Sequence, residues 1–186
     1  MRFLVKRNVG NQTVLAGAAE GSALLSRLLT GVEEPKAPEP LFLDFDGIAV
    51  ATASFLRDGP LAYRQLVRSR GSNVYPVIAN ANDKIIEELG LFLLSENDAL
   101  FCCSLSRAGS ASNVRVIGKL DEKQSFTLEL VRRLREVDTG RLVNGRFDPS
   151  VKATAWNNRL AGLVDKGLLM ESARGRAKYF RLSVGA

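Results

Sequence analysis

Three short apolar runs separated by helical patterns constrain the fold of this chain most. The runs are LFLDF (41–45), NVYPVIA (73–79) and ALFCCSL (99–105), each of strand length. A helix is predicted over residues 52–69, with a disturbance where Gly59 and Pro60 interrupt it. Another helix is predicted after Asn82, which is a suitable N-cap residue. Strands that alternate with helices at this spacing indicate an α/β layer structure.

The flanking segments extend this pattern into a mixed sheet. Residues 2–6, 12–16 and 113–118 are predicted to form short strands, and residues 20–32 carry leucines at helical spacing. The proline-rich stretch 33–40 is predicted to be a surface loop. Cys102 and Cys103 are adjacent, so on a strand they point to opposite faces and are expected to be buried hydrophobic residues rather than a disulfide or a metal site.

Composition excludes several classes of function. The chain has 186 residues and no histidine, which removes Ser-His-Asp and Cys-His catalysis and most zinc sites. We therefore expect no catalytic residues, no metal and no cofactor. The N-terminal residues lack the apolar run of a signal peptide, and no stretch approaches the roughly 20 apolar residues of a membrane span. A cytoplasmic protein without a membrane partner is expected.

Charge divides the chain into two unequal parts. Residues 1–118 hold 12 Lys/Arg against 12 Asp/Glu, whereas residues 119–186 hold 14 against 8, so the net charge of +6 lies in the second part. A local field of one sign attracts polyanions. The sequence therefore predicts a neutral domain over 1–118, a basic domain over 119–186, and double-stranded DNA as a partner of the second.

The basic part has its own pattern of elements. A helix is predicted over 122–137 with Phe126 on its inner face, then an irregular stretch over 141–147. A second helix is predicted over 151–166, with Trp156 and Leu160 facing inward and Gly167 ending it. Two strand-like segments, LLMES and KYFRLS, are joined by Ala-Arg-Gly-Arg, which is typical of a hairpin with a basic tip.

The string NNRLAGLVDKGLL followed by this hairpin resembles the winged helix-turn-helix family of bacterial regulators over residues 119–184. That resemblance implies a helix in the major groove and a wing on the neighbouring backbone or minor groove. Carried over by position, Thr154, Ala155 and Asn158 face bases, and Asn158 is able to pair with adenine. The residues expected at phosphates are Lys152, Asn157 and Arg159 on the helix and Arg174, Arg176 and Lys178 on the wing. A module that binds protein instead of DNA is the alternative.

The segment LDFDGIAVATASF resembles the STAS-like family of small α/β interaction domains over residues 12–105. The resemblance implies a sensor or partner-binding role, and it makes Ser54 a possible phosphorylated switch, although a plain N-cap is the simpler expectation for that serine. A homodimer or protein contact is expected through this domain, at a sheet edge or at the helix face over 89–94. The predicted whole is a STAS-like mixed-sheet domain followed by a winged helix-turn-helix domain, acting as a DNA-binding transcriptional regulator.

A competing resemblance is carried by the Asp-x-Asp-Gly at the end of the first run. It is similar to the first motif of haloacid dehalogenase-like phosphatases, in which Asp44 would be the nucleophile and Asp46 the acid/base, with magnesium. Ile48 and Asn80 stand where that family has threonine and serine or threonine. The alternative is that both aspartates accept backbone N–H bonds in the turn that follows the strand.

Overall fold

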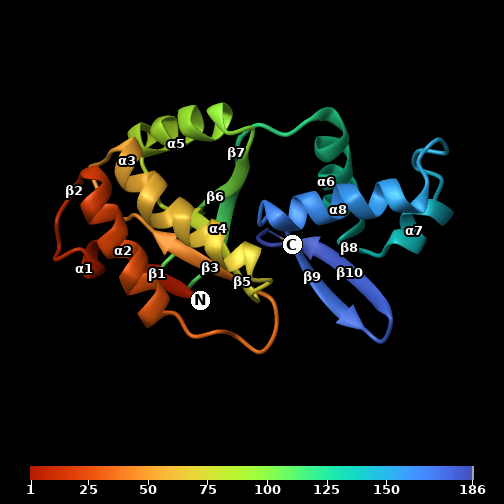
Figure 1. Cartoon of the computed structure of the whole chain (residues 1–186), viewed down its shortest axis with the longest axis horizontal. Coiled ribbons are helices and arrows are strands. Elements are labelled where there is room, and N and C mark those ends of the chain that lie inside the picture. Colours follow the sequence, from red (N-terminus) through yellow and green to blue (C-terminus); the bar gives the residue numbers. More distant parts are fainter. Residues whose placement is uncertain (186) are drawn as a thin grey trace.

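The computed structural model describes residues 1–185 and has a mixed α/β fold around one five-stranded sheet (Figure 1). The strand order is β1-β3-β5-β6-β7. The strands are β1 (Arg2–Leu4), β3 (Glu39–Asp44), β5 (Val74–Ala79), β6 (Ala99–Leu105) and β7 (Ala111–Gly118). The first four are parallel and β7 is antiparallel to β6. The mixed sheet predicted from the apolar runs is thus present.

Three helical segments cover one face of this sheet. They are α2 (Gly17–Gly31), the continuous helix formed by α3 (Ala53–Leu56), η1 (Arg57–Leu61) and α4 (Ala62–Ser69), and α5 (Asp83–Ser95). The parallel strands are added in chain order from one edge, so right-handed crossovers place every connecting helix on the same side. Leu28, Phe55 and Leu89 pack there against Leu43 and Ile78 in one apolar core.

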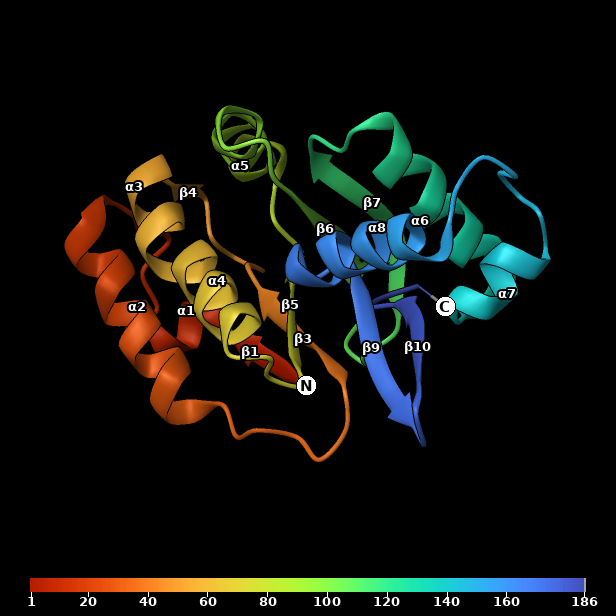
Figure 2. The same cartoon turned by 45° about the vertical axis from the view of Figure 1, so that its right-hand side comes forward.

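The basic part of the chain covers the opposite face, as Figure 2 shows. Its elements are α6 (Glu122–Leu134), β8 (Glu136–Val137), α7 (Thr139–Asn144), α8 (Ala153–Asp165), β9 (Leu169–Arg174) and β10 (Ala177–Leu182), the strands forming a sheet of order β8-β10-β9. A second core joins Val77 and Phe101 of the large sheet to Leu128, Trp156 and Leu160. Strands β5 and β6 are therefore covered on both faces, which is why their sequences are apolar almost throughout.

The first short strands differ from prediction. Residues 2–4 form β1, but the chain then turns into the short helix α1 (Val5–Asn8) instead of continuing as a strand. The next strand is only β2 (Val14–Leu15), and it pairs with β4 (Val50–Ala51) outside the main sheet. Both deviations lie between β1 and α2, where the chain passes from the sheet to the helical layer.

The predicted disturbance at Gly59 and Pro60 is a π-helical turn, η1, within one continuous helix. Gly21 of α2 lies directly against this turn. A Cβ at Gly21 would lie 2.8 Å from the Phe55 carbonyl oxygen and 3.1 Å from the Gly59 nitrogen. The two helices thus approach backbone to backbone at a point where only glycine fits.

Two predictions in the basic part are wrong in detail. The stretch predicted to be irregular contains α7, which Asp138 caps by accepting a bond of 2.7 Å from the Arg141 amide. The preceding helix ends at Leu134 because Arg135 takes a φ of 69°, and Phe126 on it is 42% exposed instead of inward-facing.

Within residues 1–185, none of the helices is both long and apolar enough to cross a bilayer.

Candidate nucleic-acid interface

The outer face of α8 carries short side chains and is exposed to solvent. Thr154, Asn158 and Ala161 recur three and four residues apart, so they form one stripe, and all are exposed. Ala155 beside them is half-buried, and Lys152 is the exposed residue at the N-terminal end of the helix. Trp156, Leu160 and Leu163 on the opposite side are fully buried. The predicted division of this helix into an inner and an outer face is confirmed.

Two of the three helix residues predicted at phosphates, Asn157 and Arg159, have partners within the protein. The Thr139 hydroxyl donates to the side-chain amide oxygen Oδ1 of Asn157, which ties the start of α7 to α8. The Arg159 guanidinium lies 4.9 Å from the centre of the Trp156 ring on the other flank of the helix. Thr139 was not predicted as part of this surface; its signal in the sequence is the Asp138-Thr139 pair, which looks like the end of one helix but is the cap and first residue of the next.

The three predicted basic residues on the hairpin of β9 and β10 differ in whether they are paired with a carboxylate. Arg174 makes two bonds of 2.7 Å to the carboxylate of Glu136, which raise its pKa further, and it stacks 4.6 Å from the Tyr179 ring centre. Lys178 pairs with Glu171 at 2.8 Å. Arg176, at the exposed tip, forms no ion pair within the described residues. One of the three cations is therefore free to meet an external anion without breaking an internal pair.

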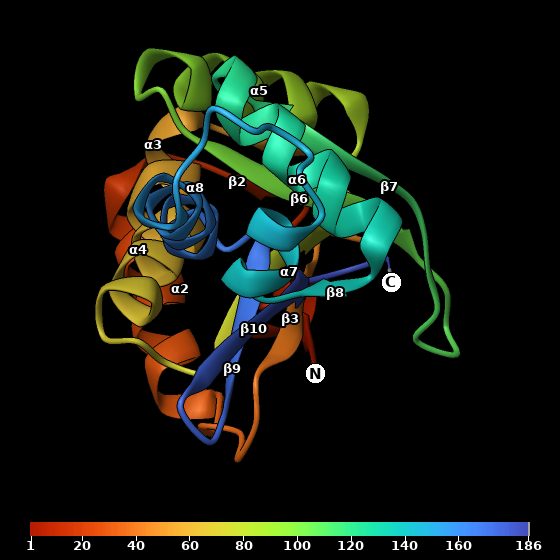
Figure 3. The ribbon, with the colours of Figure 1, turned by 90° about the vertical axis from the view of Figure 1, so that its right-hand side faces the viewer.

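A polar latch fixes the far end of α8 to the large sheet. Arg64 of α4 forms an ion pair with Asp98, and it donates to the carbonyls of Ala99 at 2.8 Å and Lys166 at 3.2 Å. Lys166 in turn donates to the Asn97 carbonyl at 2.8 Å and lies 3.3 Å from the Asp98 carboxylate. Figure 3 shows α8 end-on beside α4, with the hairpin extending away below it. The C-terminal end of α8 is thereby fixed to the α/β part.

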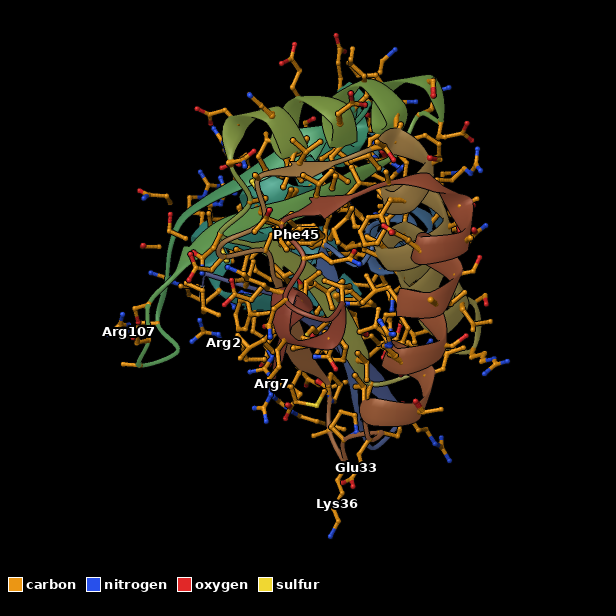
Figure 4. The ribbon with its side chains drawn as sticks, turned by 90° about the vertical axis from the view of Figure 1, so that its left-hand side faces the viewer. Arg2, Arg7, Glu33, Lys36, Phe45 and Arg107 are labelled. Carbon is orange, nitrogen blue, oxygen red and sulfur yellow. The ribbon has the colours of Figure 1, made fainter. Side chains whose placement is uncertain are left out.

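The aspartates of the competing phosphatase motif have structural partners. Asp44 is buried, and its Oδ1 accepts bonds from the Asp46 amide at 3.0 Å and the Asn80 side chain at 2.9 Å. Its Oδ2 accepts from Arg2 Nε at 2.7 Å. Asn80 also bonds to both the amide and the carbonyl of Leu105, so the network links β1 to the carboxyl ends of β3, β5 and β6. Figure 4 shows Arg2 at this edge, beside the projecting loop that carries Arg107.

The predicted switch residue is not a helix cap. Thr52 caps the helix, accepting a bond of 3.4 Å from the Phe55 amide, and it also accepts from the Gly17 amide at 3.1 Å. Ser54 is the second residue inside the helix, half-buried, with its hydroxyl 3.2 Å from that of Thr52.

No protein-family model, curated protein or solved structure matches this chain. The function of the molecule has to be inferred from its geometry.

Proposed function

We propose that the protein is a cytoplasmic, DNA-binding transcriptional regulator, in which a STAS-like α/β part carries a winged helix-turn-helix module. The observation that carries this proposal is the exposed small-residue face of α8 next to the hairpin with the free Arg176. The element order α6-β8-α7-α8-β9-β10 supports it, because a helix followed by a two-stranded wing is the arrangement that docks one helix in the major groove.

Each residue of this surface has a definite role in the proposal. Thr154 and Asn158 face base edges, where the Asn158 amide can donate to and accept from adenine. Lys152 at the start of α8 contacts phosphate, and Arg176 contacts the backbone beside the groove. Asn157 and Arg174 support this surface, since each is held by a neighbour within the protein.

The test is duplex binding measured as a function of salt with full-length protein. We expect affinity to fall steeply as salt rises, and Asn158→Ala to lower discrimination at one base position by about 1–3 kcal/mol. Gln12→Ala, which changes an exposed amide far along the chain, is the matched control and leaves the preference unchanged. A base preference identical in the wild type and Asn158→Ala would show that α8 does not read DNA, and would favour the protein-binding alternative.

We also propose that Asp44 is a structural residue and that the protein has no phosphatase activity. Both oxygens of Asp44 already accept hydrogen bonds, and Arg2 neutralises the charge that a nucleophile would use. Release of phosphate from an aryl phosphate in the presence of magnesium, abolished by Asp44→Asn, would contradict this.

We propose a second copy of the chain as the partner of the α/β part. One recognition helix reads few base pairs, and a two-fold dimer doubles the readout. The outer face of α5 is suited to this contact because Leu91 is 63% exposed and Leu94 is 51% exposed. Leu91→Lys should convert a dimer to a monomer in sedimentation, while Leu29→Lys, on the outer side of α2, should not. A wild-type monomer at micromolar concentration would exclude this partner.

A further inference from the structure

A groove of about 590 Å³ lies where the α/β part meets the end of α8. Helix α4 forms one wall, and the ends of α5 and α8 form the other. Its charged lining residues are Arg57, Arg64, Arg68, Lys166, Glu96, Asp98 and Asp165. The volume is in the range of small-molecule sites, which occur preferentially at junctions of this kind.

Arg68 in this groove is a buried cation without a carboxylate partner. It is only 8% exposed, and within residues 1–185 no carboxylate lies within ion-pair distance of it. Its guanidinium donates to the Ser72 carbonyl and stacks 3.7 Å from the Tyr75 ring centre, while its Nε has no hydrogen-bond partner. Buried charges are normally paired, so this site lacks an anion.

The other charges of the groove divide into satisfied and unsatisfied ones. Asp98 is neutralised by Arg64 and Lys166, and Arg57 is paired with its neighbour Asp58 at 2.7 Å. Glu96 and Asp165 are exposed carboxylates that form no ion pair among the described residues. The groove therefore offers an unpaired cation on one wall and unpaired carboxylates on the other.

We propose that this groove binds a small zwitterion, an α-amino acid with an apolar side chain. Its carboxylate would lie against Arg68, and its ammonium group against Glu96 and Asp165. Leu61 and Phe92, which also line the groove, would contact the apolar side chain. A simple anion would meet repulsion from the acidic wall, and a simple cation would meet repulsion from the arginines. Only a ligand with both charges compensates both walls.

The groove lies against the C-terminal end of α8, so a bound ligand would contact that helix. Asp165 is the last residue of that helix, and Lys166 next to it belongs to the polar latch. A ligand held between α4, α5 and this end would bias the orientation of the outer face of α8. This regulatory role rests on the proposed DNA binding, whereas the binding of the ligand does not.

The test uses full-length protein and L-leucine as the probe, by calorimetry and by thermal unfolding. We expect saturable binding and a raised melting temperature, and no effect from isopentylamine or 4-methylpentanoate, which lack the carboxylate and the amine. Glu96→Gln and Asp165→Asn, both exposed changes, should each weaken binding by roughly tenfold or more. Glu88→Gln, on the outer face of α5, is the matched control and should leave binding unchanged.

The outcomes separate this inference from the proposed function. No binding by L-leucine or any other apolar L-amino acid at millimolar concentration would overturn it, as would binding that both groove variants retain. Equal affinity for 4-methylpentanoate would also overturn it, because the acidic wall would then have no role. Leucine binding in a protein that ignores DNA would leave the inference standing and would reject the DNA-binding proposal alone.

Discussion

At the scale of single residues, the basic side chains of the hairpin differ in what they are free to do. Arg174 and Lys178 are each bound to a glutamate, whereas Arg176 at the tip is not. Formal charge counted along the sequence overstates the positive field of this hairpin, because ion pairs across it cancel part of that charge.

This difference leads to a prediction for DNA binding. Arg176→Ala should weaken binding to all sequences equally and reduce the slope of log affinity against log salt by about 0.9, the loss of one phosphate contact. Arg174→Ala should change the salt slope less, since that arginine already has a carboxylate partner, and should instead lower the melting temperature slightly. Salt titrations and thermal unfolding of the two variants measure both effects. A larger slope change for Arg174→Ala would show that its ion pair opens on binding.

The buried cysteines predict how stability depends on alkaline pH. Burial raises the pKa of Cys103 from 9.0 to about 11, with the nearby Cys102 and Asp44 adding to the shift, and burial likewise raises the pKa of Tyr63 to about 12. A group whose folded pKa is raised stabilises the fold below its unfolded pKa and loses that contribution as pH rises toward the folded value. The free energy of unfolding should therefore decline above about pH 9.

Urea unfolding at pH 7, 9 and 10.5 measures this decline. Cys103→Ala should be less stable than the wild type at neutral pH but should lose less stability between pH 9 and 10.5. Parallel declines in both proteins would assign the alkaline loss to Tyr63 and other groups.

At the scale of elements, the close contact between α2 and η1 predicts the effect of adding one methyl group. Gly21→Ala would place a methyl group 2.8 Å from the Phe55 carbonyl oxygen, so α2 would have to move from η1, at a cost of about 1–3 kcal/mol. Gly31→Ala is the matched control in the same helix, where the nearest atom, on Phe3, is 3.9 Å from the added Cβ. It should be neutral or stabilising. Thermal unfolding of the two variants makes the comparison, and equal melting temperatures would contradict the close packing.

Elements with long or strongly apolar patterns could be predicted from the sequence. The strands β3, β5 and β6 and the helix α5 with its Asn82 cap fall where the pattern placed them. The helix α7 could not be predicted, because its six residues carry only one buried leucine, Leu142. Their helical state depends on the Asp138 cap and on packing against α8. The end of α6 at Arg135 likewise depends on β8 joining β10, a long-range contact.

The candidate interface could likewise be predicted only where a local sequence pattern defines it. The outer stripe of α8 follows from helical periodicity alone, so Thr154 and Asn158 are found where expected. The pairing of Arg174 with Glu136 was not predictable, since it joins residues of two strands whose register only the folded sheet defines. The groove beside Arg68 has no local signal at all.

At the scale of the whole molecule, the two parts of the chain share a core. Val77, Phe101 and Leu105 of the large sheet pack on residues from α6, α8 and β10, and among the described residues 1–185 no other layer covers that face. The charge boundary near residue 119 therefore separates two surfaces but does not separate two interiors.

A fragment of residues 1–118 tests the importance of this shared core. We expect it to expose the apolar face of β5 and β6, to bind a hydrophobic dye and to self-associate, unlike the full chain. Its unfolding midpoint in urea should be lower as well, because the second core is missing. A monomeric fragment with the midpoint of the full chain would show that the sheet is stable with one face uncovered.

The chain order of the strands also has a consequence for synthesis on the ribosome. Each parallel strand can join its predecessor as it emerges, because β1, β3, β5 and β6 lie in the sheet in the order in which they are made. The face opposite α2 and α5 waits for residues 119–182, which at roughly 5–20 residues per second takes on the order of 3–13 s. During that interval the nascent sheet presents Val77 and Phe101 to the cell, so a chaperone that captures apolar strands should associate with the growing chain and leave once α8 has docked.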